Sequence, residues 1–324
     1  MGAGNSPGET PSPVGLPVGG GTPGGPSAGA LPGPLVGVEW LAPRLGGPGL
    51  VVLDASVGAH RRVEPDAPGG APRVRDGRTA IPGARIFDID GALSDRTSPL
   101  PHTMPGAGHF TDELRALGVN DTDAVVVYDA VGVYSSARAW WMLRAMGFDR
   151  AAVLDGGLPA WTDAGLPVVS DGPEPVCLRG DFTARPRPGL FADGAEVAAA
   201  LADPGAAVLD ARARGRFSGE AAEPRPGLRG GHMPGAANLP FGEIQHRGRM
   251  LPAARLRTAF AAAAGGRERL VLSCGSGVTA CVLALGAELA GYRDLSVYDG
   301  SWSEWGLPSA RPVVAGNGPS PQHP

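Results

Sequence analysis

The sequence carries the same series of short motifs twice, in the same order. In each half, an apolar strand shortly follows the second motif, and a further strand, a loop and an apolar helix come before the third motif. The paired segments are Leu53–Ala55 with Leu209–Ala211, Ile81–Ala84 with Met233–Ala236, and Val153–Trp161 with Val297–Trp305. A series of this length indicates a tandem duplication, so the chain must fold as two copies of one unit.

The length of 324 residues fits two domains better than one. We expect a first domain over residues 35–168 and a second over residues 182–314, joined by a Pro- and Gly-containing linker at residues 169–181. Residues 1–34 are mostly Gly, Pro, Ser and Thr, and they have almost nothing to bury. We expect this segment and the tail at residues 315–324 to be disordered.

The fold class follows from the length and the residue types of the apolar runs. Several runs are short, rich in β-branched residues and apolar on both faces, which is typical of parallel strands buried beneath helices. These runs are Leu50–Ser56, Ala124–Ala130, Ala206–Ala211 and Arg269–Cys274. Helical patterns at Ser135–Phe148 and Val278–Tyr292 follow two of them. The sequence therefore predicts the α/β class, with a parallel β-sheet flanked by helices in each domain.

The composition limits which partners and which cellular compartment we expect for the protein. The net charge is −4 without a basic block, so we expect no nucleic-acid partner. No apolar run is long enough to span a bilayer, and the N-terminus does not resemble a signal peptide. Three cysteines cannot build a disulfide framework, and neither cysteine nor histidine spacing suggests a metal site. We expect a cytoplasmic protein without metal or membrane association.

One cysteine occupies a position suited to chemistry. Cys274 ends a predicted strand, and Gly275 and Gly277 follow it at once. Open α/β sheets bind ligands at this edge, glycines let backbone N–H groups converge, and the next helix directs its positive end there. Such surroundings lower a thiol pKa from its usual value of about 8.5. Cys274 is therefore the candidate nucleophile, whereas Cys177 and Cys281 are expected to be structural.

Other chemistries of such a loop fit less well. A cysteine phosphatase needs an arginine six residues after the cysteine, and Ala280 stands there. A nucleophile elbow needs a glycine two residues before Ser276, where the chain has Cys274. In the first repeat Asp129 replaces the cysteine, so thiol chemistry is confined to the second. A buried structural role remains the alternative for Cys274, because lone cysteines are usually small core residues.

The loop Cys274–Ala280 reads Cys-Gly-Ser-Gly-Val-Thr-Ala and resembles the two-domain rhodanese family, most closely its 3-mercaptopyruvate sulfurtransferase branch. The resemblance covers Leu35–Val313. Members that use thiosulfate usually carry Arg and Lys after the cysteine, so the uncharged loop implies a different donor. By the same resemblance, substrate contacts in the loop come from Gly275, Gly277, Val278 and Thr279.

The resemblance also implies where the donor is held and how protons move. Arg216 and Arg225 would bind the carboxylate and keto oxygen of mercaptopyruvate. Asp90 would join Cys274 and Ser276 in a catalytic arrangement at the domain boundary, where it could orient the Ser276 hydroxyl. His102 would lie beside them as a substrate-binding residue.

On spacing alone, two of these groups have a simpler explanation. Asp88 and Asp90 would face one side of a strand, where they are equally expected to be solvated carboxylates. Arginines in an arginine-rich segment also usually stay solvated. The family's first-domain histidine is replaced by Ala80, whereas the second copy keeps His232, which we expect to be structural.

These features predict a sulfurtransferase. The Cys274 thiolate would take sulfur from 3-mercaptopyruvate, release pyruvate and pass sulfur from a persulfide to cyanide, a small thiol or a thioredoxin-like protein. No metal or organic cofactor would be needed. Two alternatives stay open, a thiosulfate:cyanide sulfurtransferase and a non-catalytic sulfur-sensing or binding module.

Overall fold

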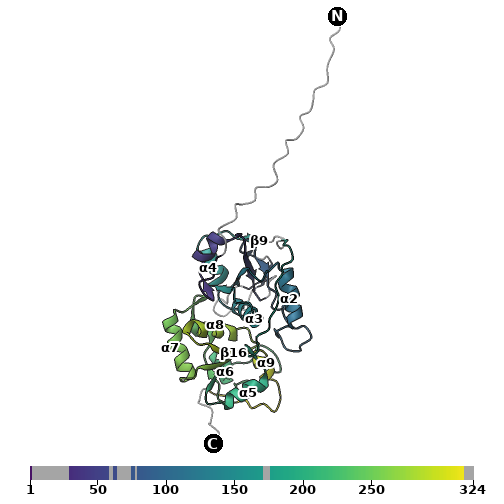
Figure 1. Ribbon diagram of the computed structural model, residues 1–324. Helices are drawn as coiled ribbons and strands as arrows, with labels where there is room; N and C mark the ends of the chain where they lie inside the picture. The colour runs from purple at the N-terminus through teal and green to yellow at the C-terminus, as the bar shows by residue number, and fades with distance from the viewer. Residues whose placement is uncertain (2–28, 58–60, 64–73, 77–78, 171–175, 317–324) are drawn as a thin grey trace.

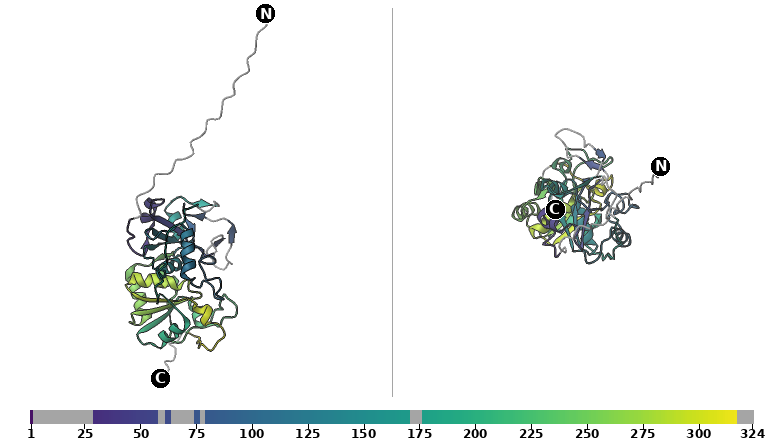
Figure 2. Two further views of the ribbon diagram at one scale, coloured as in Figure 1. Left: turned by 45° about the vertical axis from the view of Figure 1, so that its right-hand side comes forward. Right: turned by 90° about the horizontal axis from the view of Figure 1, so that it is seen from above.

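The computed structural model describes residues 1, 29–57, 61–63, 74–76, 79–170 and 176–316. Most of the two terminal segments expected to be disordered, at residues 1–34 and 315–324, lies outside the described residues. Within the described part of the chain, no helix is both long and apolar enough to cross a membrane. The chain forms two stacked lobes, one built mainly from its first half and the other from its second half (Figures 1 and 2).

Each lobe contains a five-stranded parallel sheet, and the strand order is the same in both. The first sheet has the order β1-β8-β7-β2-β6, from β1 (Leu35–Val36), β2 (Leu50–Asp54), β6 (Arg85–Ile86), β7 (Ala124–Tyr128) and β8 (Ala151–Leu154). The second has the order β10-β16-β15-β11-β12, from β10 (Phe191–Ala192), β11 (Ala206–Asp210), β12 (Ala237–Asn238), β15 (Arg269–Ser273) and β16 (Asp294–Tyr298). This correspondence confirms the predicted α/β class and the duplication.

Helices cover the sheets, and short antiparallel ribbons lie at their margins. The helices of the first lobe are α1 (Val38–Leu41), α2 (Ala107–Ala116), α3 (Ser136–Ala145) and α4 (Gly157–Asp163), with the 3-10 helix η1 (Ala42–Arg44). Those of the second are α5 (Gly194–Ala202), α6 (Arg214–Ser218), α7 (Ala253–Ala264), α8 (Ala280–Ala290) and α9 (Ser301–Trp305), with η2 (Phe241–Ile244). The ribbons pair β3 (Arg61–Val63) with β4 (Val74–Asp76), β5 (Thr79–Ala80) with β9 (Val169–Ser170), and β13 (Gln245–His246) with β14 (Arg249–Met250).

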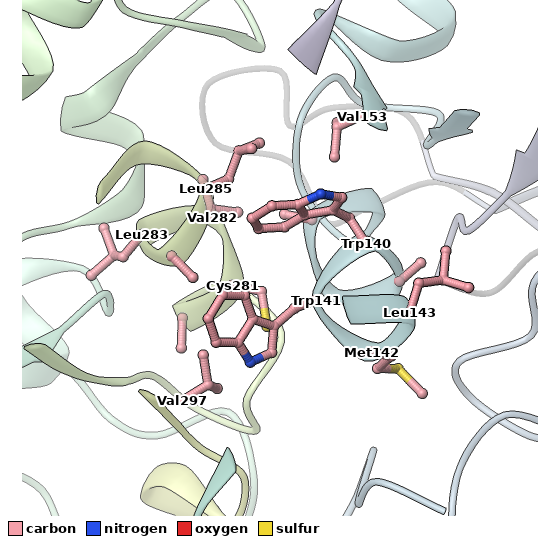
Figure 3. Packing of buried hydrophobic residues seen from close by; sticks show 14 of the residues in the cluster. Trp140, Trp141, Met142, Leu143, Val153, Cys281, Val282, Leu283, Leu285 and Val297 are labelled. Atoms are coloured by element: carbon pink, nitrogen blue, oxygen red, sulfur yellow. The ribbon is translucent and has the colours of Figure 1, made fainter. Parts of the chain in front are cut away.

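The two lobes share one hydrophobic core where α3 packs against α8. Trp140 and Trp141 of α3 are each 1% exposed and face Cys281 and Leu285 of α8 (Figure 3). Both helices are buried on nearly all sides, which explains why neither shows a polar face in the sequence. Burial raises the pKa of the Cys281 thiol to about 12, so Cys281 is a protonated core residue.

In the first copy of the repeat, the loop after β7 has Asp129 where the second copy has Cys274. The buried carboxylate of Asp129 accepts backbone N–H bonds from Val131, Tyr134 and Ser136, at 3.1, 2.8 and 2.9 Å. The Ser136 hydroxyl donates a further bond of 2.7 Å. Burial raises the pKa of Asp129, and these bonds oppose the rise. In the first copy, the Asp129 carboxylate therefore binds the backbone N–H groups of the loop that corresponds to the Cys274 loop of the second copy.

The shared core makes a prediction for stability. Trp141 is buried between the lobes, and its indole N–H donates a 3.0 Å bond to the carbonyl of Leu190. Trp141→Ala should therefore lower the free energy of unfolding by about 3–5 kcal/mol, measured by urea denaturation. Trp40→Ala, in the partly exposed helix α1, is the matched control and should cost clearly less. A loss below about 1 kcal/mol for Trp141→Ala would contradict a shared core.

Candidate functional site

Strand β15 places Cys274 at the carboxyl edge of the second sheet, and α9 holds the loop that follows. The Ser301 hydroxyl accepts the N–H groups of Cys274 and Gly277, each at 3.1 Å, and donates to the carbonyl of Tyr298 at 2.7 Å. The Cys274 carbonyl accepts the Trp302 N–H at 3.0 Å. Ser301 has φ 46°, which a non-glycine residue adopts only at a cost. Its three hydrogen bonds offset that cost and fix the curvature of the loop.

Helix α8, which follows the loop, begins two residues later than the sequence pattern suggested. Val278 is buried, Thr279 is the residue before the helix, and α8 begins at Ala280. Gly277 has φ +75°, a conformation that glycine adopts readily. The four loop residues expected to contact substrate, Gly275, Gly277, Val278 and Thr279, therefore lie between Cys274 and the positive end of an 11-residue helix.

Both predicted arginines lie against this loop. A Cβ atom built on Gly275 would be 3.1 Å from Nη2 of Arg216 and 3.8 Å from Nη1 of Arg225. The Nη2 group of Arg225 also donates to the Ser276 hydroxyl at 3.3 Å. The structure thus brings together two guanidinium groups that lie nine residues apart in the sequence. Any side chain at position 275 would crowd them, which gives the uncharged Gly275 a physical reason.

A buried carboxylate orients one of the two arginines. The Glu223 side chain is 2% exposed and accepts from Nη2 of Arg216 at 2.5 Å and from Nη1 of Arg212 at 2.7 Å. Arg212 is in turn paired with Asp210 at the end of β11. Within the described part of the chain, no carboxylate pairs with Arg225. The cluster therefore presents one braced guanidinium and one whose charge is not neutralised by a neighbouring acid.

A hydrogen-bonded chain from the first domain reaches the loop. Nδ1 of His102 lies 2.9 Å from Oγ of Ser276, and Nε2 lies 3.0 Å from Oδ1 of Asp90. The resemblance implied that Asp90 could orient the Ser276 hydroxyl, and in the structure the His102 imidazole lies between the two side chains. Asp90, with its side chain 40% exposed, is therefore connected to Ser276 through His102. His102 stands in this chain rather than only beside the substrate.

The strand expected to carry the two aspartates ends before them. Strand β6 stops at Ile86, and Asp88 and Asp90 lie in the turn that follows. Phe87 and Ile89 are nevertheless buried, so the alternation of burial continues beyond the ladder. The alternation of apolar residues thus identified the buried positions but not the strand boundary.

His232, which we expected to be structural, is buried, and its ring stacks on the Phe217 ring with 3.8 Å between the ring centroids.

Sequence reasoning missed a tyrosine in this site. Tyr134 comes from the loop of the first domain that holds Asp129. Its pKa is raised, first by burial and then by the charge of Cys274, while Arg216 and Arg225 act in the opposite direction. Tyr134 therefore lies within electrostatic range of the cysteine and of both arginines. Its place in the duplicated loop was the only sequence signal that could have identified it.

The burial of Cys274 has two sides. Its side chain is 1% exposed and belongs to the shared core, which fits the structural alternative. The residues immediately after it, however, touch two guanidinium groups and the Asp90–His102–Ser276 chain. Purely apolar packing does not bring such groups together, because buried polar groups are costly unless they are paired. The surroundings of Cys274 therefore combine a buried thiol with polar and charged groups from both domains.

Comparison with known proteins agrees with this geometry. A family model described as "Rhodanese-like domain" matches residues 38–164 and 193–307. The 3-mercaptopyruvate sulfurtransferase of Escherichia coli K12 is 37% identical over 279 residues, covering 86% of this chain and 96% of the relative. The human 3-mercaptopyruvate sulfurtransferase is 40% identical over 292 residues, covering 86% and 93%.

A solved structure shows the same architecture. The crystal structure of SseA from Escherichia coli superimposes with a TM-score of 0.70 and 35% identity, covering 84% of this chain and 100% of SseA. The repeated sheet order and the matches in both halves of the sequence point to one conclusion. The chain belongs to the rhodanese family, as a two-domain sulfurtransferase.

Proposed function

We propose that this enzyme transfers sulfur from 3-mercaptopyruvate to a thiol or to cyanide through a persulfide on Cys274, and releases pyruvate. The observation that carries the proposal is the pair of guanidinium groups, Arg216 and Arg225, over Gly275. A keto acid offers a carboxylate and a carbonyl oxygen on adjacent carbons, and two neighbouring guanidinium groups match both. The names of the relatives support the same donor.

Binding in this orientation would direct the donor's thiol at Cys274. Each charge-assisted hydrogen bond contributes about 1.5–3 kcal/mol, and two of them fix orientation as well as affinity. Because Glu223 already braces Arg216, that guanidinium loses little freedom when the donor binds. Arg225, without a paired acid in the described chain, supplies the charge that balances the donor's carboxylate.

The first half-reaction would proceed as follows. The Cys274 thiolate attacks the donor's sulfur, an S–S bond forms, and the donor's C–S bond breaks. The electron pair of that bond passes into the pyruvate enolate, whose oxygen the arginines stabilise. The proton of the donor's thiol moves through the Ser276 hydroxyl, which His102 and Asp90 orient, to the enolate carbon. Pyruvate leaves, and Cys274 carries the persulfide.

The second half-reaction returns the enzyme to its starting state. A thiolate or cyanide attacks the outer sulfur, the S–S bond breaks, and the Cys274 thiolate leaves. We propose cyanide, a small thiol or a protein thiol of the thioredoxin type as the acceptor. The persulfide carries the sulfur between the half-reactions, so the scheme requires no metal or organic cofactor. Free cysteines throughout support a reducing compartment, and we propose the cytoplasm.

The persulfide can be detected directly. After incubation with 3-mercaptopyruvate and removal of excess donor, the intact protein should gain the mass of one sulfur atom while pyruvate is released. Cys274→Ser should abolish both the gain and the pyruvate. Cys281→Ser is the matched control and should keep both, because Cys281 is a buried core residue. A binding module without activity would gain no sulfur from this donor, and that result would end the proposal.

Donor choice can be separated from sulfur chemistry. Arg216→Ala and Arg225→Ala should each lower kcat/KM for 3-mercaptopyruvate about 10- to 100-fold, from the loss of a charge-assisted bond. Turnover of thiosulfate with cyanide should fall much less. Arg214→Ala is the control, since Arg214 lies on the same helix but is 64% exposed and paired with Glu243. Equal losses with both donors would favour thiosulfate:cyanide sulfurtransferase activity instead.

A further inference from the structure

An arginine of the first domain is buried at the domain boundary without any part in the scheme above. Arg138 of α3 is 0% exposed. Burial by itself lowers the pKa of a guanidinium, but the neighbouring Asp299 and Cys281 together raise the pKa of Arg138 above its usual value, so the group stays charged. Its Nη2 group donates to Oδ1 of Asp299 at 2.6 Å. A charge pair at this depth costs desolvation, which its hydrogen bonds must offset.

The contacts of this pair converge on the segment that carries His102. The Nη2 group of Arg138 also donates to the carbonyl of His102 at 2.6 Å. The other oxygen of Asp299 accepts the N–H of Met104 at 2.8 Å. His102 itself has φ 60°, which is unfavourable for a residue with a side chain and persists only where the surroundings impose it. Arg138 and Asp299 supply that constraint by bonding to the backbone of the segment at two points, the carbonyl of His102 and the N–H of Met104.

The same guanidinium touches the cysteine loop. Its Nη1 group donates to the carbonyl of Gly277 at 3.4 Å, next to Ser276. A Cβ atom on Gly277 would lie 2.9 Å from that Nη1 group, so the loop approaches Arg138 as closely as a glycine allows. One side chain thus contacts the backbone on both sides of the 2.9 Å contact between His102 and Ser276.

We propose that Arg138, paired with Asp299, is a positioning residue that holds the His102 imidazole on the Ser276 hydroxyl. The inference rests on the proposed function, because the proton that His102 helps to move is that of the donor's thiol. Arg138 acts through His102 and touches no reacting atom. When the pair is broken, the His102 backbone can leave its left-handed conformation, and the imidazole then loses Ser276.

Kinetics of two matched variants test this role. Arg138→Lys keeps a positive charge but cannot donate to Asp299, His102 and Gly277 together. It should lower kcat for pyruvate formation at least about 10-fold, with KM for 3-mercaptopyruvate little changed, because Arg216 and Arg225 remain. Arg144→Gln is the control: Arg144 lies on the same helix and also pairs with the second domain, through Glu288. It should keep the wild-type kcat.

A double-mutant cycle separates positioning from a general loss of structure. If Arg138 acts through His102, then Arg138→Lys should have little further effect on kcat in a His102→Asn background. Losses that multiply in the double variant would overturn the proposal. So would an equal loss of kcat in Arg144→Gln, because that result would assign the effect to domain docking.

An NMR measurement decides the question without any substrate. The imidazole resonance of His102, assigned by its absence in His102→Asn, should shift in Arg138→Lys and stay unchanged in Arg144→Gln. If Arg138→Lys does not fold, Asp299→Asn serves instead, because it weakens the same pair. An unmoved resonance in the folded variant would refute the positioning role. A wild-type protein that forms no pyruvate would refute the proposed function alone, since the NMR result does not depend on turnover.

Discussion

The site depends on the packing of α3 against α8, because half of its polar groups reach the cysteine loop from the first domain. Trp140 and Trp141 fill the space between the two helices, and their burial fixes how closely the domains approach. His102 of the first domain then contacts the Ser276 hydroxyl, while Arg216 and Arg225 of the second lie against Gly275. A non-directional apolar contact thus sets the geometry of directional polar ones.

The loops that carry Asp129 and Cys274 correspond in the two copies of the fold, but they are held in different ways. In the second copy, the Ser301 hydroxyl accepts the N–H groups of Cys274 and Gly277 and so fixes the loop. In the first, the Asp129 carboxylate takes the N–H groups of its own loop, so that loop is already filled. The first domain has Asp129 in place of a cysteine, but it supplies His102 to the cysteine loop of the second domain. Groups from both copies therefore surround the proposed site at Cys274.

Much of the fold was predictable from sequence, and the site only in part. Buried parallel strands are continuous apolar runs, so the duplication and the α/β class could be predicted. The glycines that follow Cys274 identified it as the candidate nucleophile. The resemblance supplied Arg216 and Arg225, which spacing could not distinguish from solvated arginines. The place of His102 between Asp90 and Ser276 was not predicted, nor were Tyr134 and Arg138. These contacts cross between domains, and local sequence patterns do not encode how two domains dock.

The central claim is that Cys274 carries sulfur between two separate half-reactions. The most direct measurement is rapid mixing of the enzyme with 3-mercaptopyruvate in the absence of any acceptor. Covalent catalysis predicts a burst of one pyruvate per chain, after which the enzyme, freed of donor, converts added cyanide to thiocyanate in the same amount. Pyruvate formation only when donor and acceptor are present together would contradict the account, because sulfur would then pass directly between the two substrates.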